Sequence, residues 1–196
     1  MNYKAVITVV ILVLLTGFTE GCSAQKQQGA KTDKTENHEI FKPDLIERSH
    51  SVQVNAEPDE VFLLFAPTET EKWSLRRKYF ETHKLISGSD GDLSGYSVFL
   101  SGSRGQIWSS VAKYDKKERL LRKIEIYPGI KFQVSEYRCV SNPNGGTTLT
   151  ATWKVTGMTS EGNEAVRNFM DSGTFESVID GLAKQLNDYL AEFAGN

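Results

Sequence analysis

The spacing of hydrophobic and polar residues changes along the chain and predicts the order of its elements. In residues 45–54 apolar side chains come to alternate with polar ones, which is the pattern of a strand with one buried face. Pro58 suits a first helical turn, and a second short helical segment follows Pro67 and ends at Trp73. Period two then returns in six runs separated by turn signals, which predict an antiparallel meander. These runs are residues 79–88, 95–102, 105–115, 119–129, 130–140 and 147–158.

The end of the chain returns to helical spacing. From Thr174 onward apolar residues recur every three or four positions, and Gly173 predicts a break between this helix and a shorter helical segment before it. One long helix must cover the dry face of the sheet, so the sheet has to curl around it. The sequence therefore predicts an α+β fold with a curved antiparallel sheet of about seven strands around a long C-terminal helix.

Two strands indicate which residues face that helix. In residues 147–158, Leu149 and Trp153 share an apolar face opposite a row of threonines. In residues 130–140 the set that begins Ile130, Phe132 and Val134 continues with Glu136 and Arg138, and its leading hydrophobic residues predict that this set faces inward. Two buried charges must then bind each other or a polar ligand group. The alternative is that the strand twists and both charges reach solvent at the rim.

The N-terminus has the layout of an export signal. An uninterrupted apolar run, Ala5–Leu15, follows Lys4, and the uncharged stretch of about 15 residues is shorter than the roughly 20 that a membrane span needs. Cys22 then resembles the lipobox cysteine of bacterial lipoproteins, which receives diacylglycerol and becomes the new N-terminus. Thr19 stands where that motif usually has leucine, so ordinary signal cleavage after Ala24 is the alternative.

The residues after Cys22 are nearly all polar. Residues 23–40 contain too few apolar side chains to offset the entropy of ordering, and we expect a disordered tether with a reach of about 20 Å. The predicted organisation is a signal peptide at 1–22, the tether at 23–40 and one domain at 41–196. The domain is long enough to bury about two thirds of its surface without a disulfide. If Cys22 is lipidated, Cys139 has no partner.

Charge and motifs exclude several classes of function. The chain has 23 basic and 25 acidic residues, a formal net charge of -2, and no basic stripe of the kind that nucleic-acid binding requires. The three histidines are not at metal-ligand spacing, and nucleophile-elbow, phosphate-loop and dinucleotide-loop motifs are missing from the sequence. We expect no metal, cofactor or nucleic-acid partner.

The element order resembles the helix-grip fold of the START and polyketide-cyclase superfamily, also called SRPBCC. The resemblance is carried by SVQVNAEPDEVFLLFAPTETEKW, by the strand end IEIYPG and by TTLTATWKVTGMTSEGNEAV, and it covers about Leu45 to Phe193. Members of the superfamily hold lipids, sterols or polyketides between sheet and helix, and some are cyclases or dehydratases. The resemblance implies a ligand cavity between the sheet and the last helix.

These observations predict an exported, lipid-anchored protein of the cell envelope that binds an apolar or amphipathic small molecule. One alternative is a cofactor-free cyclase or dehydratase with Glu136 or His83 as general base. A second is an envelope interaction protein with a filled core. The residues expected to line the cavity are Trp108, Phe132, Val134, Glu136, Arg138, Trp153, Phe175 and Ile179.

Overall fold

The computed structural model describes residues 41–87 and 93–193, so the predicted signal peptide with Cys22 and the whole predicted tether lie outside the described residues. The chain divides after Phe41, and every element described here belongs to the unit Lys42–Asn196. In chain order the elements are β1 (Leu45–Val54), α2 (Pro58–Leu64), α3 (Pro67–Trp73), the 3-10 helix η1 (Leu75–Lys78), β2 (Phe80–Ile86), β3 (Ser97–Gly102), β4 (Gly105–Asp115), β5 (Leu120–Tyr127), β6 (Lys131–Ser141), β7 (Thr147–Gly157), α4 (Ser160–Asp171) and α5 (Thr174–Phe193).

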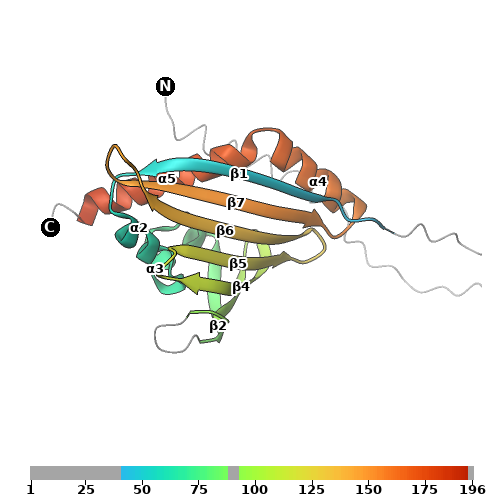
Figure 1. Ribbon diagram of the computed structural model, residues 1–196. Helices are drawn as coiled ribbons and strands as arrows, with labels where there is room; N and C mark the ends of the chain where they lie inside the picture. The colour runs from blue at the N-terminus through green and yellow to red at the C-terminus, as the bar shows by residue number, and fades with distance from the viewer. Residues whose placement is uncertain (1–40, 88–92, 194–196) are drawn as a thin grey trace, which may run out of the picture. The chain divides into compact units, whose positions relative to one another are not determined.

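The seven strands form one antiparallel sheet in the order β1-β7-β6-β5-β4-β3-β2 (Figure 1). Strands β2 to β7 are a meander, and β1 completes the sheet by pairing with β7 along its whole length. The sheet curves, and α5 packs against β1 on its concave side while α4 packs against β7. The predicted curved sheet, its two short helices after the first strand and its long C-terminal helix are confirmed.

The two last helices meet at the predicted break. Gly173 has a φ of +78°, a left-handed conformation that glycine adopts without strain, and it separates α4 from α5. The apolar stripe of α5 is fully buried at Phe175, Ile179 and Leu186, each with 0% exposure. Burial of this stripe is what holds a surface helix of this kind on the sheet.

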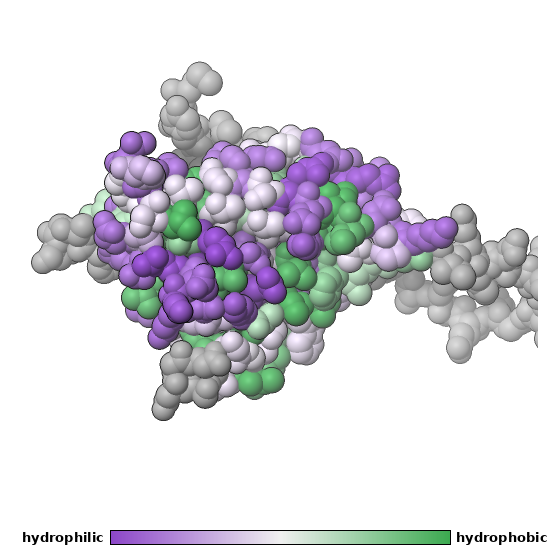
Figure 2. Space-filling view, viewed as in Figure 1, coloured by the Kyte–Doolittle hydropathy of each residue, from purple (hydrophilic) through white to green (hydrophobic). Residues whose placement is uncertain are grey.

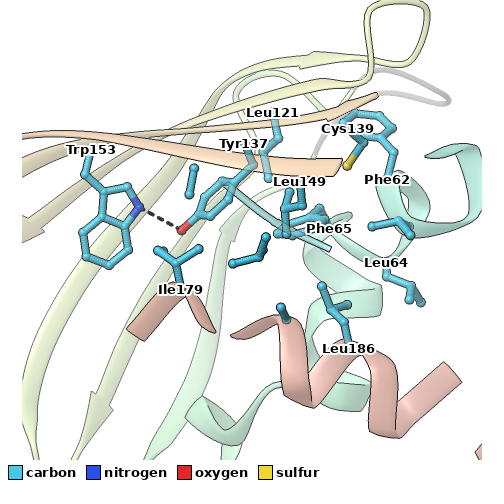
Figure 3. Packing of buried hydrophobic residues seen from close by; sticks show 14 of the residues in the cluster. Phe62, Leu64, Phe65, Leu121, Tyr137, Cys139, Leu149, Trp153, Ile179 and Leu186 are labelled. Atoms are coloured by element: carbon cyan, nitrogen blue, oxygen red, sulfur yellow. Dashed lines mark hydrogen bonds between the residues drawn. The ribbon is translucent and has the colours of Figure 1, made fainter. Parts of the chain in front are cut away.

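The hydrophobic core lies between α5, α2 and the concave faces of β5 to β7 (Figure 3). Tyr137 and Cys139 of β6 point toward the helices, and the Trp153 indole N–H donates to the Tyr137 hydroxyl at 3.3 Å. Phe62 of α2 stacks on Tyr114 of β4, with ring centroids 4.8 Å apart. Cys139 is a buried free thiol, and burial raises its pKa to about 12, so it is an inert core residue.

Asn163 of α4 fixes the segment that precedes β1. Its side-chain oxygen accepts the Asp44 N–H at 3.2 Å, and its Nδ2 donates to the Lys42 carbonyl at 3.0 Å. Arg167, one turn further along α4, pairs with the Asp44 carboxylate. A Cβ at Gly157 would lie 2.2 Å from the Asn163 backbone nitrogen, so only glycine fits beneath this helix. We call these contacts the Asn163 clamp.

Strand β6 faces the opposite way from the prediction. Its buried residues are Gln133, Ser135, Tyr137 and Cys139, and the set that contains Phe132, Val134, Glu136 and Arg138 lies on the convex side. The cause is the register with β7, in which Ser135 pairs with Trp153, Tyr137 with Ala151 and Cys139 with Leu149. Directly paired residues share a face, so the apolar face of β7 decides the orientation of β6. The prediction from the leading hydrophobic residues of β6 is wrong.

Candidate functional site

A cavity of about 90 Å³ lies between the concave face of β2 to β5 and the segments α3 and η1. This is room for about three water molecules. Helix α5 covers the half of the sheet near β1. The half formed by β2 to β5 is covered instead by α3 and η1, the short segments after α2. The lining residues are Phe65, Pro67, Thr70, Glu71, Ser74, Arg76, Phe80, Thr82, Tyr96, Val98, Leu100, Ser109, Val111 and Lys123.

An ion pair joins η1 to the sheet at the edge of the cavity. Arg76 donates from Nη1 to the Glu125 Oε1 atom at 2.7 Å and from Nη2 to the Tyr127 hydroxyl at 3.0 Å. The Glu125 side chain is 2% exposed, whereas that of Arg76 is 40% exposed. Burial raises the pKa of Glu125, but the charges of Arg76 and Lys123 outweigh burial and lower this pKa to about 2. Glu125 is therefore ionised at neutral pH and holds η1 in place.

Lys123 is the second cation of the cavity, two residues before Glu125 on the same face of β5. Its ammonium lies 5.5 Å from the Tyr137 ring centroid, and within residues 41–87 and 93–193 it makes no hydrogen bond or ion pair. Burial lowers the pKa of Lys123, and the neighbouring Arg76 charge adds to this effect while Glu125 opposes it. Its nitrogen keeps some contact with solvent, and an oxygen atom placed in the cavity would find a hydrogen-bond donor here.

Polar side chains continue from Glu125 onto β6. The Gln133 amide donates from Nε2 to the Ser135 hydroxyl at 2.7 Å and, more weakly, to the second Glu125 oxygen at 3.4 Å. The Gln133 Oε1 atom accepts from the Lys131 ammonium at 2.8 Å. Gln133 and Ser135 have no exposed surface, so this network is internal to the concave face.

The Lys131 ammonium lies among three aromatic rings. It is 4.4 Å from the ring centroid of Tyr127, 5.3 Å from that of Phe169 and 5.8 Å from that of Trp153. Ring faces attract cations, which offsets part of the lost hydration. Burial still lowers the pKa of Lys131 to about 8, so the amine is partly neutral just above physiological pH.

Three of the predicted cavity residues lie inside the protein but pack against one another. Trp153 has its ring centroid 5.3 Å from that of Phe175 and stacks at 6.0 Å on Phe169 of α4. Phe175 and Ile179 are fully buried in the core, and none of the predicted three lines the cavity described above. The region between the sheet and α5 is filled here, and the cavity is bounded by α3 and η1 instead.

The other five predicted residues are on the convex face, away from the cavity. Trp108 is 47% exposed and Arg138 is exposed, while Phe132 and Val134 are partly covered by their neighbours. Glu136 pairs with Arg122 of β5 at 2.7 Å and not with Arg138. The expectation that Glu136 and Arg138 form a polar floor inside the cavity is wrong, for the reason of register given above.

The two candidate general bases also lie on the convex face. His83 of β2 pairs with Phe99 of β3, its ring is half-exposed, and its Nε2 lies 3.0 Å from the Ser101 hydroxyl. Glu136 is held by Arg122, as described. Neither side chain reaches the cavity, so the proposed general-base roles of both residues have no support in this geometry.

Sequence reasoning missed the charged residues Arg76, Lys123, Glu125 and Lys131 and the amide Gln133, which bring polar groups to the concave side. A signal was present in β5, where Leu121, Lys123, Glu125 and Tyr127 alternate with a set that is apolar except for Arg122. The inside of an antiparallel sheet is normally the apolar set, and β5 reverses this rule. A polar set placed inside is a feature of binding sites, because its desolvation must be offset by partners.

A larger groove of about 560 Å³ lies at another place, between the β1–α2 connection, the β6–β7 turn and α5. Its side chains are amides, two carboxylates and small apolar groups. Asn187, its main amide, already binds the backbone of Asn55 and Gln53. Because the two carboxylates of this groove, Glu57 and Glu60, are both exposed to solvent, we assign the candidate site to the smaller cavity.

No group of three or more His, Cys, Asp and Glu side chains within 41–87 and 93–193 is arranged to hold a metal ion. In the same part of the chain no helix has both the length and the apolar character required for a membrane span.

Solved structures share this architecture at low sequence identity. The crystal structure of Ara h 8.0201 matches with a TM-score of 0.57 and 12% identity, over 76% of this chain and 99% of that protein. A START superfamily protein from Mycobacterium smegmatis matches at 0.56 and 15%, over 75% and 98%. The Zhui aromatase/cyclase from Streptomyces matches at 0.56 and 18%, over 74% and 93%. The chain has the helix-grip fold.

At these identities the helix-grip likeness concerns the fold alone. No family model matches the sequence, and no curated protein matches it. The helix-grip neighbours include a START superfamily protein and an aromatase/cyclase, so this architecture serves proteins of more than one kind.

Proposed function

We propose that this protein binds a small amphipathic molecule in the cavity beneath α3 and η1, with an acidic or carbonyl oxygen of the ligand at Lys123. The observation that carries the proposal is the Lys123 ammonium, which faces the cavity without an acceptor among the described residues. Arg76 lies on the same wall, where Glu125 neutralises its charge, and the carboxylate of Glu71 also lines the cavity. An oxygen acceptor as the polar part of the ligand is therefore favoured by the hydrogen-bond donors of Lys123.

The rest of the cavity wall favours an apolar body. Phe65, Tyr96, Val98, Leu100 and Val111 also line it, and a mostly apolar wall with a few polar groups is the usual composition of a small-molecule site. The volume of about 90 Å³ admits a short apolar group. A larger ligand requires α3 and η1 to move outward.

Such a movement would have to break several contacts of α3 and η1. The Trp73 indole N–H donates to the Leu64 carbonyl at 2.8 Å, and the Trp73 ring packs against Phe65 with ring centroids 5.8 Å apart. The Leu75 N–H donates to the Gln185 side chain at 3.0 Å. Arg76, which is 40% exposed, forms an ion pair with Glu125 and also binds the Tyr127 hydroxyl. A ligand oxygen that binds Lys123 and Arg76 together would replace part of this ion pair, so binding and opening can be coupled.

We also propose that the protein is exported and held in the cell envelope by lipid on Cys22. Support comes from the apolar run Ala5–Leu15 and from the small residues around Cys22. An anchored protein with an internal cavity is suited to hold a hydrophobic molecule of the envelope.

Straight-chain acids test the binding proposal. Isothermal titration calorimetry with octanoate and with octanol compares the same apolar body with and without the acidic group. We expect octanoate to bind more tightly, and Lys123→Met to weaken octanoate about tenfold while it leaves octanol unchanged. Lys113→Met is the matched control, because Lys113 is on the same sheet but exposed on the convex face. Equal affinity of wild type and Lys123→Met for octanoate would contradict the proposal.

A further inference from the structure

The convex face of the sheet carries a row of apolar side chains in direct cross-strand register. Trp108 of β4 pairs with Phe99 of β3 on one side and with Ile126 of β5 on the other, and the rings of Trp108 and Phe99 are 4.8 Å apart. Ile126 pairs with Phe132 of β6, and Thr156 of β7 links Phe132 to Leu45 of β1. We call this set the outer row; its apolar members are Phe99, Trp108, Ile126, Phe132 and Leu45.

The outer row is confined to one end of the face. Figure 2 shows hydrophobic residues gathered toward the end of the sheet where β1 begins, with hydrophilic ones over the rest of this face. At the other end the same strands carry Arg122, Glu136, Thr152 and Ser49 in one row, and further on Arg138 and Thr150. The open face of an antiparallel sheet is normally polar along its whole length. The change from polar to apolar along the same strands marks an interaction surface.

The chain enters the domain at this same end. Leu45, the last member of the outer row, is 70% exposed and begins β1, and the Asn163 clamp holds the residues just before it. Between Cys22 and this point lie the predicted tether residues 23–40, with a reach of about 20 Å. An acyl chain on Cys22 would thus keep the outer row within a short distance of a bilayer.

Charge at the outer row also fits a lipid surface. No carboxylate belongs to the row. In the rows beside it Lys154 pairs with Glu47 at 3.2 Å. The exposed Glu81 carboxylate lies 3.8 Å from the ring of His83, which pairs with Phe99. Aromatic and aliphatic side chains without net charge partition into the interfacial region of a bilayer. We propose that the outer row docks the domain on the surface of the membrane to which Cys22 anchors it, with Trp108 inserted among the lipids. This proposal rests on the Cys22 anchor proposed above, and it does not depend on ligand binding at Lys123.

Tryptophan fluorescence tests the docking. The chain has three tryptophans, and Trp108 is 47% exposed, whereas Trp73 and Trp153 are each 8% exposed. Mature protein is reconstituted into phosphatidylcholine vesicles whose acyl chains carry bromine, a contact quencher of indole. We expect strong quenching relative to unbrominated vesicles, which Trp108→Phe abolishes. Phe132→Glu should reduce the quenching about fivefold or more, because a carboxylate enters the interface. Arg138→Glu, on the same face of β6 at its polar end, should leave the quenching unchanged.

Three results would overturn the proposal. The first is equal emission in brominated and plain vesicles, and the second is quenching that Phe132→Glu does not change. The third is a shift of Trp108 emission that increases with the density of protein in the vesicles but does not change with the bromine content of the lipids. That result would show that the outer row contacts a second copy of the protein. Mass spectrometry of the mature N-terminus reports the anchor separately, so a protein without lipid can be tested by mixing it with the same vesicles.

Discussion

Lys131 is the clearest case of a residue whose position costs stability. Its ammonium is enclosed by the rings of Tyr127, Phe169 and Trp153, and burial lowers its pKa from 10.5 to about 8. Between these two values the unfolded chain binds more protons than the folded protein does. The free energy of unfolding must therefore rise with pH across this window, and below pH 8 the cost of the buried charge is present in full.

Lys131→Met should remove this cost and the pH dependence together. We expect the variant to be more stable than wild type at neutral pH by about 1 to 2 kcal/mol, and the difference to shrink as the pH approaches 10. Urea unfolding of both proteins at pH values from about 7 to about 10 measures this, with Lys113→Met as an exposed control. If the free energy of unfolding of the wild type falls between about pH 7 and about pH 10, and that of Lys131→Met falls in the same way, the lowered pKa of Lys131 is refuted.

At the scale of elements, the orientation of β6 determines what its charges do. Arg138 is exposed, and Glu136 binds Arg122 in a cross-strand pair whose side chains are 28% and 47% exposed. Exposed pairs of this kind contribute little, because solvent screens them. If Arg138 faced inward and paired with Glu136, removal of Arg138 would leave the Glu136 carboxylate buried and without a partner.

Arg138→Ala should therefore cost less than about 1 kcal/mol of unfolding free energy, compared with about 3 to 5 kcal/mol for breaking a buried pair. Urea denaturation of the variant and of wild type at neutral pH decides between the two values. Phe175→Ala, which removes a fully buried ring from α5, serves as the reference for a large loss. A loss for Arg138→Ala near that of the reference would mean that β6 faces inward after all.

The elements were predictable where one face of the pattern is uniform, and the site was not. In β7 all inward positions are apolar or small and all opposite ones polar, so its burial follows from the sequence. In β5 and β6 the outer row makes the solvent side apolar and the network around Glu125 makes the inner side polar, so hydrophobicity alone assigns the wrong face. The cavity wall at η1 consists of Leu75–Lys78, a single turn too short to show any period.

At the scale of the whole molecule, the prediction concerns the segment before Phe41. Cys22→Ser should yield protein that is uncleaved or that lacks lipid, because the thiol is the acylation site, and the mature wild type should partition with membranes. Two or more acyl chains are needed for stable anchoring. Membrane fractionation and mass spectrometry of the N-terminus measure both effects, and a wild-type N-terminus at Gln25 would show ordinary signal cleavage instead.

The Asn163 clamp has a mechanical consequence for a domain pulled by its leading segment. β1 is an edge strand bonded to β7 alone in the sheet, and such a strand can be peeled away one hydrogen bond at a time. Tension that arrives from before Lys42 first meets the two hydrogen bonds of Asn163 and the pairing of Asp44 with Arg167. The clamp transmits this force to α4. The hydrogen bonds between β1 and β7 therefore bear no tension until the contacts of the clamp break.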